Sequence, residues 1–168
     1  MPLDRTWIEQ HIPHQGRMCL LDAVMSWDAT RIRCRSLSHR HPDNPLRAHG
    51  RLGAACGIEY AAQAMAVHGA LVAASAPLAS ALTRDVRGTL GTAAAGYLAS
   101  VRHVTLHVAR LDDLGEELVA SAERVTGNAR TVLYEFELWA GAARLLEGRA
   151  SIVIAAALPP AAAAGSLA

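Results

Sequence analysis

The stretch from Arg51 to Leu71, RLGAACGIEYAAQAMAVHGAL, constrains the fold of this chain more than any other segment. It is the longest window of helix-forming residues and is rich in alanine, so it predicts a helix of about five turns, roughly 30 Å long. Because long polar side chains are scarce in it, we expect other elements to enclose this helix on several sides. Its small side chains would also let neighbouring strands come close.

Two polar side chains share one face of the predicted helix. Glu59 and Gln63 are four positions apart, and their neighbours on that face are small or apolar. Burial would raise the pKa of the Glu59 carboxyl, so we expect an acid that can donate a proton. The alternative is a solvated surface glutamate whose contact with Gln63 is only weakly stabilising.

Length, charge and hydropathy exclude several classes of protein. A chain of 168 residues is the size of one domain that buries a core without disulfides. The formal net charge is +1 and the basic residues are scattered, which argues against a nucleic-acid partner. The sequence contains neither a long uncharged apolar run nor a signal-peptide pattern, so we expect a cytoplasmic protein without a membrane span.

The residues that commonly bind metals and nucleotides do not form known motifs. The three cysteines lack CxxC spacing and are expected to be small buried side chains rather than disulfide or zinc ligands. His103 and His107 would share one face of a strand, which leaves a metal pair as a minor alternative. No phosphate-binding glycine motif is present, so we predict no metal and no resident cofactor.

The rest of the chain predicts an antiparallel sheet around the helix. Residues 4–11 predict a short helix that ends before Pro13, and residues 38–50 predict a loop. Strands are expected over 18–27, 30–37, 97–108, 116–124, 130–139 and 144–155, the last four as a meander. Residues 72–96 predict a short helix around 78–84, a lid or a linker. We expect one domain over 1–157 and a disordered tail over 158–168.

This order of elements, two strands, one long helix and four strands, is typical of an α+β fold. In it an antiparallel sheet wraps around one central helix, and the concave face of the sheet meets the helix. The small residues of the helix make the close wrap possible.

Three motifs in this order resemble the hot-dog-fold 3-hydroxyacyl-acyl-carrier-protein dehydratases, and most closely their relatives from aryl polyene and similar pigment gene clusters. The resemblance covers roughly residues 12–155. The motifs are IPHQGRMCLLDAV, GIEYAAQAMAVHG and GYLASVRHVTLHVARLDDLGEEL. In the second of them, Glu59, Ala62 and Gln63 match the spacing of the acid and the Ala-Gln pair on the family's central helix.

The resemblance implies a syn elimination of water from a 3-hydroxyacyl thioester. In such enzymes a histidine removes the proton next to the thioester carbonyl, and the helix acid helps the hydroxyl leave. Glu59 takes the role of the acid by position. The backbone amides of Ala54 and Ala55 would hold the thioester oxygen, and Gln63 would line the substrate site.

The position of the catalytic histidine is where the sequence departs from the family. The His-Phe-Pro-Gly motif is missing, and an ungapped match puts Pro45 where its histidine belongs. Loop histidines are the candidates, ranked His39, His41 and then His49, and idle exposed histidines are the alternative. His14 is a further candidate, although the resemblance implies a structural or pocket-lining role for it.

The resemblance also implies partners. We expect an acyl carrier protein that presents the substrate on phosphopantetheine, and a homodimer or a heterodimer with another hot-dog subunit. A basic rim for the carrier could come from Arg31, Arg33, Arg35, Arg40, Arg47 and Arg51, although the first three could equally form a solvated strand face. Two other functions stay open: a catalytically weak partner subunit, in which no histidine comes within about 5 Å of Glu59, and an acyl thioesterase.

Overall fold

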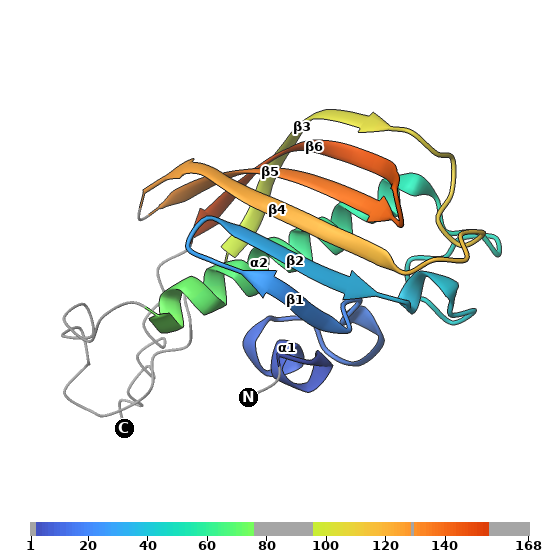
Figure 1. Ribbon diagram of the computed structural model, residues 1–168, viewed down its shortest axis with the longest axis horizontal. Coiled ribbons are helices and arrows are strands. Elements are labelled where there is room, and N and C mark those ends of the chain that lie inside the picture. Colours follow the sequence, from blue (N-terminus) through green and yellow to red (C-terminus); the bar gives the residue numbers. More distant parts are fainter. Residues whose placement is uncertain (1–2, 76–95, 129, 155–168) are drawn as a thin grey trace, which may run out of the picture.

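A six-stranded antiparallel sheet curves around one long helix in the computed structural model, which describes residues 3–75, 96–128 and 130–154 (Figure 1). This confirms the predicted α+β architecture. The helices are α1 (Arg5–His11) and α2 (Gly57–Ser75). The strands are β1 (Ala23–Trp27), β2 (Arg31–Ser36), β3 (Gly96–Leu106), β4 (Leu118–Gly127), β5 (Thr131–Ala140) and β6 (Ala143–Ile154).

The strand order in the sheet is β1-β2-β4-β5-β6-β3. The prediction of a four-stranded meander is therefore wrong for its first strand, because β3 pairs with β6 and does not lie beside β4. The reason is that β4 is already paired on both sides, with β2 and with β5. The remaining edge of β6 is the place left for β3, which itself forms one edge of the sheet.

The prediction of a strand over 18–27 is correct only for its second half. Gly16–Met18 form a turn of 3-10 helix, and β1 begins at Ala23. Cys19, Leu20 and Leu21 between them are fully buried. The Leu20 backbone does not need a neighbouring strand because side chains bind it: its amide donates to Gln63 of α2, and its carbonyl accepts from Ser36 of β2.

The long helix begins later and ends later than predicted. Residues Ala54–Cys56 form a 3-10 turn, and α2 runs from Gly57 to Ser75. Gly53 instead pairs with Arg110 in an isolated bridge, which keeps the chain extended before the helix. Residues 76–95, with the expected short helix or lid, and the tail over 158–168 lie outside the described residues.

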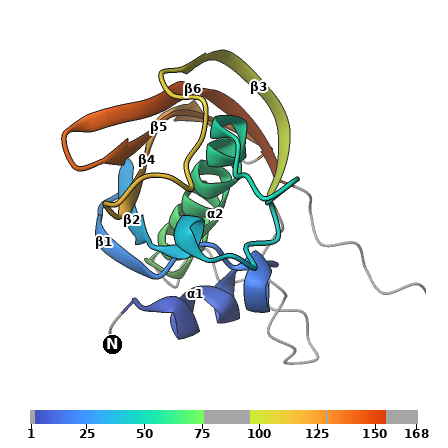
Figure 2. The same cartoon turned by 90° about the vertical axis from the view of Figure 1, so that its right-hand side faces the viewer.

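The N-terminal helix α1 lies next to β1, which forms one edge of the sheet. Asp4 caps α1 by accepting a hydrogen bond from the Trp7 amide (3.1 Å), and it bridges to Ala23 of β1. Figure 2 shows α1 beneath α2, beside β1. Neither helix that the structure describes is long and apolar enough to cross a membrane.

Gly57 sets how closely the start of α2 approaches the sheet. A Cβ atom at this position would lie 2.7 Å from Leu138 Cδ2 and still closer to Leu146 Cδ2. Both leucines are fully buried in the core. A larger residue here would have to displace the ends of these two buried side chains, so the helix meets β5 and β6 in the close approach that the small residues predicted.

The C-terminal half of α2 is held by a buried histidine. His68 is fully buried; its Nδ1 lies 2.8 Å from the Tyr134 hydroxyl and its Nε2 lies 2.9 Å from the Asp28 carbonyl oxygen. A carbonyl can only accept, so Nε2 carries the proton and Nδ1 accepts from Tyr134. Burial lowers the pKa of His68, which keeps the ring neutral.

We expect Gly57→Ala to destabilise the chain by about 1–3 kcal/mol, because the added methyl group overpacks the contact with β5 and β6. Gly69→Ala is the matched control, since Gly69 is an exposed glycine of the same helix and its Cβ would meet nothing within 4 Å. That control should gain roughly 0.5–1 kcal/mol from helix propensity. Urea unfolding of both variants measures the difference, and a stabilised Gly57→Ala would contradict the close approach.

We expect the chain to lose stability as the pH falls below about 6.5, the pKa of an unperturbed histidine. Because the pKa of His68 is lowered on folding, the unfolded chain binds a proton in this range that the folded chain does not. Urea midpoints between about pH 8 and pH 5 measure the loss. His68→Gln should make the stability depend less steeply on pH. Burial also lowers the pKa of His39, so His39 contributes a further loss of stability at low pH. A slope that His68→Gln leaves unchanged would contradict this.

Candidate active site

Glu59 lies in the first turn of α2 and contacts one histidine of the same chain. Its Oε1 lies 3.0 Å from Nε2 of His14 and also accepts a hydrogen bond from Nε2 of Gln63 (3.0 Å). The side chains of Glu59 and His14 are 31% and 28% exposed, so the pair is shielded but reachable from solvent. Among the described residues no group bonds the second carboxylate oxygen, Oε2, which is therefore open to a ligand.

Gln63 binds the N-terminal segment to the helix with a single buried amide. Besides Glu59, its Nε2 donates to the Met18 carbonyl (2.7 Å), and its Oε1 accepts from the Leu20 amide (2.8 Å). Gln63 itself is fully buried. Its polar atoms are thus committed to the protein, so this geometry makes it a positioning residue; its predicted contact with substrate stays a prediction.

The pKa of Glu59 is lowered, which corrects the expectation that burial would raise it. Burial has the largest single effect and does raise this pKa. The hydrogen bonds from His14 and Gln63, together with the charge of His14, outweigh it because they favour the ionised carboxylate. In the chain without substrate Glu59 is therefore a carboxylate at neutral pH and acts as a hydrogen-bond acceptor.

The histidines that the sequence ranked first lie elsewhere. His39 is fully buried, and its Nε2 lies 3.3 Å from the Leu114 carbonyl oxygen. His41 is exposed and lines a small hollow of about 220 Å³ with Arg5 and Arg17. Neither they nor His49 contact Glu59 in the described part of this chain. Their predicted catalytic roles stay predictions, whereas the contact itself belongs to His14.

The loop that carries these histidines is fixed to the turn before β4. Arg47 donates to the backbone carbonyl oxygens of His39 and His41 and pairs with Asp112 (3.3 Å). Asp112 also accepts from the Leu52 amide (2.9 Å). The hydrogen bond from Arg110, followed by that from Leu52, holds the pKa of Asp112 well below its usual range. These contacts set where α2 begins.

The start of α2 leaves one of the two predicted amides free in the described residues. The Ala54 amide is used, because it donates to the Ala109 carbonyl (3.1 Å), and the Cys56 amide donates to Gly53 (3.0 Å). The Ala55 amide has no partner within the described residues, and Ala55 is exposed. Of the two amides predicted to hold a thioester oxygen, Ala55 is therefore the one available, at the positive end of the helix dipole.

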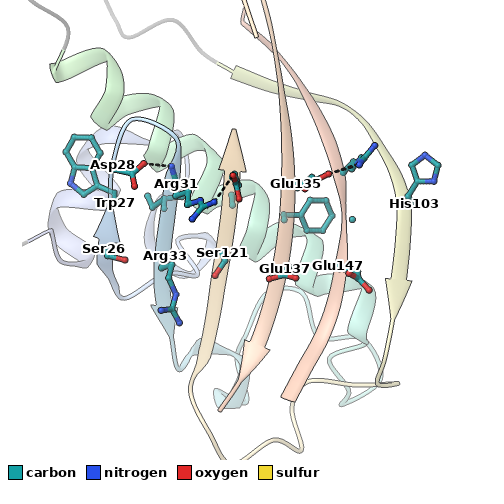
Figure 3. Close-up of a pocket in the computed structure, with 16 residues that line it drawn as sticks. Ser26, Trp27, Asp28, Arg31, Arg33, His103, Ser121, Glu135, Glu137 and Glu147 are labelled. Carbon is teal, nitrogen blue, oxygen red and sulfur yellow. Dashed lines mark hydrogen bonds and ion pairs between the residues drawn. The ribbon is translucent and has the colours of Figure 1, made fainter. Parts of the chain in front are cut away.

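A broad hollow elsewhere on the described structure does not contain these residues. It lies on the face of the sheet that points away from α2 and encloses about 850 Å³ (Figure 3). Ion pairs between neighbouring strands cross it, among them Arg31 with Glu123 (3.0 Å) and Arg149 with Glu135. Its charged side chains largely neutralise one another, which is typical of a solvated sheet face.

Two minor expectations concern metals and arginines. The described residues contain no group of three or more side chains placed to hold a metal ion. His103 lines the outer hollow, and His107 pairs with Glu147 (3.2 Å). Arg31 pairs with Glu123 of β4 and Arg35 with Glu117 just before β4, which favours the solvated strand face over a carrier-binding rim for these two.

The sequence contained His14 within its Pro-His motif but gave no signal that it meets Glu59. The two residues are far apart in the chain, and the turn that joins them depends on contacts of Gln63 to backbone atoms. Backbone partners leave no trace in a sequence pattern, so only the folded chain reveals the pair.

The sequence matches a family described as "ApeP-like: ApeP dehydratase" over residues 6–159. No curated protein matches it. A solved structure, the dehydratase heterocomplex ApeI:P from Xenorhabdus doucetiae, is similar with a TM-score of 0.69 and 20% identity, covering 94% of this chain and 93% of that chain.

Two further solved structures share the fold. The zebra fish thioesterase superfamily member 2 has a TM-score of 0.57 at 12% identity, covering 90% of this chain and 95% of its own. The Escherichia coli PaaI protein from the phenylacetic acid degradation operon has a TM-score of 0.52 at 13% identity, covering 77% and 80%. These similarities confirm the predicted hot-dog fold.

We expect Gln63→Leu to destabilise the chain by roughly 2–4 kcal/mol, because it leaves the Met18 carbonyl and the buried Leu20 amide without partners. Gln10→Leu, on the exposed side of α1, is the control and should change stability by less than about 0.5 kcal/mol. Thermal and urea unfolding measure both. Equal stability of the two variants would show that the hydrogen bonds of Gln63 contribute nothing to the stability of the chain.

Proposed function

The chain belongs to the ApeP-like dehydratase family, and we propose on this premise that it removes water from a 3-hydroxyacyl thioester bound to an acyl carrier protein. The product is the trans-2-enoyl thioester, as needed in aryl polyene or fatty-acid synthesis. The reaction breaks the C2–H and C3–O bonds and forms a C2=C3 double bond. It therefore needs one group that takes a proton and one that returns a proton to the leaving hydroxyl.

The observation that carries this proposal is the position of Glu59 beside the free Ala55 amide at the start of α2. A thioester oxygen at that amide gains a donor and the positive end of the helix dipole when negative charge develops on it. The open Oε2 of Glu59 lies one helical turn further along the same helix. The helix thus offers, close together, a donor for the carbonyl and a carboxyl for the hydroxyl.

We propose that the substrate arrives on the phosphopantetheine of a carrier protein, with no resident cofactor. The loop before α2 carries Arg40 and Arg51, which pair with no carboxylate among the described residues. Both are exposed. A cationic loop in front of the helix suits an acidic carrier and the phosphate of its arm better than the arginines on the sheet face do.

A second hot-dog subunit, in a homodimer or a heterodimer, is the other proposed partner. The β3 edge has no strand neighbour on its outer side in the described chain, and it exposes Tyr97, Leu98, Val104 and Leu106. A long edge strand with apolar side chains is a site for pairing with another chain. The similar X. doucetiae structure is a dehydratase heterocomplex, which supports this proposal.

Of the alternatives, the ionised state of Glu59 favours the thioesterase, since a carboxylate can activate water. The weak-partner alternative predicted that no histidine comes within about 5 Å of Glu59. His14 at 3.0 Å does not meet that condition.

We expect the purified chain to remove water from a 3-hydroxyacyl carrier protein, and Glu59→Gln to slow this by about 10²–10⁴-fold because the proton donor is lost. Mass spectrometry of the carrier-bound chain reads the product. Glu147→Gln is the control, since this glutamate also pairs with a histidine but lies on the sheet. Release of free acid would make the chain a thioesterase, and an unchanged acyl chain, with the partner subunit present or absent, would contradict catalysis.

A further inference from the structure

We propose that His14 is the second proton-transfer group of the site, so that each chain carries a complete histidine–glutamate pair of its own. This inference rests on the proposed dehydration. It differs from what the resemblance implied, namely a histidine from the loop over 38–50 that acts on the acid of another subunit. The pair observed here is formed within one chain, at 3.0 Å between His14 Nε2 and Glu59 Oε1.

The hydrogen bonds of His14 differ from those of a structural histidine. His68 uses both ring nitrogens, one toward Tyr134 and one toward Asp28, and is fully buried. The Nδ1 of His14 is buried and finds no partner in the described chain, so its Nε2 contact with Glu59 is the one bond that holds the ring. A ring tied only to a carboxylate is suited to exchange a proton with it.

The segment that carries His14 is tied to both helices by hydrogen bonds. Gln63 binds Met18 and Leu20 to the same helix that carries Glu59. Arg5 donates to the Gly16 carbonyl (2.9 Å), and Gly16 has a positive φ of 55° that shapes the turn. The histidine and the acid are therefore positioned by one helix and one tight turn, without help from a second chain.

The proton balance closes within the pair. One proton is shared between His14 Nε2 and the Glu59 carboxylate, which lie 3.0 Å apart. When substrate excludes water, desolvation favours the neutral form, so the proton moves from His14 Nε2 to Glu59. Nε2 then takes the C2 proton while Glu59 gives its proton to the C3 hydroxyl; the C3–O bond breaks and water leaves. After the step His14 Nε2 holds the proton taken from C2 and Glu59 is again a carboxylate, so the pair shares one proton as before.

His14→Gln tests the role of the ring directly, because a glutamine amide can still donate to Glu59 but cannot take a proton. We expect kcat/KM to fall by about 10²–10⁴-fold, with exchange of the C2 proton into D₂O lost as well. His107→Gln is the matched control, since His107 forms a similar pair with Glu147 at 3.2 Å on the sheet. This control should keep full activity.

The outcomes separate this inference from the proposed function. If the wild-type chain does not dehydrate the substrate, the proposed function fails. If it does so, and Glu59→Gln is inactive while His14→Gln keeps its rate and its C2 exchange, only the role of His14 is overturned. His39→Gln and His41→Gln, made in parallel, would then identify the histidine that acts.

Mixed oligomers decide whether the pair acts within one chain. Glu59→Gln and His14→Gln chains with different tags are co-expressed and purified through both tags. A pair within one chain predicts that the mixed species is as inactive as either variant alone. A site shared between chains predicts recovery of one of its two sites, which would overturn the inference. If the two variants do not co-purify, activity of the wild-type chain purified without any other subunit supports the pair within one chain, and activity that appears only with a second subunit overturns it.

Discussion

The buried amide of Gln63 is the contact on which the site depends. One side chain binds the carboxylate of Glu59, the carbonyl of Met18 and the amide of Leu20. A buried amide that loses any of these partners is costly, so the N-terminal segment and the helix stay in one arrangement. His14 reaches Glu59 because these hydrogen bonds fix the position of the turn that carries His14. The segment of His14 is thus positioned through backbone atoms, and its ring is held by the contact with Glu59.

Two further anchors fix the start of the helix. Gly57 lets α2 lie against Leu138 and Leu146 of the sheet. Asp112 holds the chain before the helix through the Leu52 amide and Arg47. With its position set from the sheet and its beginning set from the loop, the helix presents Glu59 and the Ala55 amide at one end. In the proposed reaction the Ala55 amide stabilises negative charge on the thioester oxygen, and Glu59 acts on the leaving hydroxyl.

The sequence predicted those features that repeat along an element. The alternation of polar and apolar residues predicted β2 and the strands from β3 to β6 within a few residues, and the alanine-rich window predicted α2. It failed where a few long-range contacts decide the structure. The pairing of β3 with β6 depends on which strand edge is free, and the coil at Leu20 depends on the side chains of Gln63 and Ser36. The lowered pKa of Glu59 depends on His14, a residue that no local pattern connects to the helix.

The titration of Glu59 in the substrate-free chain tests the coupling of the pair most directly. Carboxyl ¹³C NMR of the wild type and of His14→Ala would measure the pKa of Glu59 in each. Coupling to His14 predicts a pKa below the ordinary 4.5 in the wild type and a clear rise in the variant, where the donor and its charge are gone and burial remains. A wild-type pKa above that value, or one that His14→Ala leaves unchanged, would contradict the account.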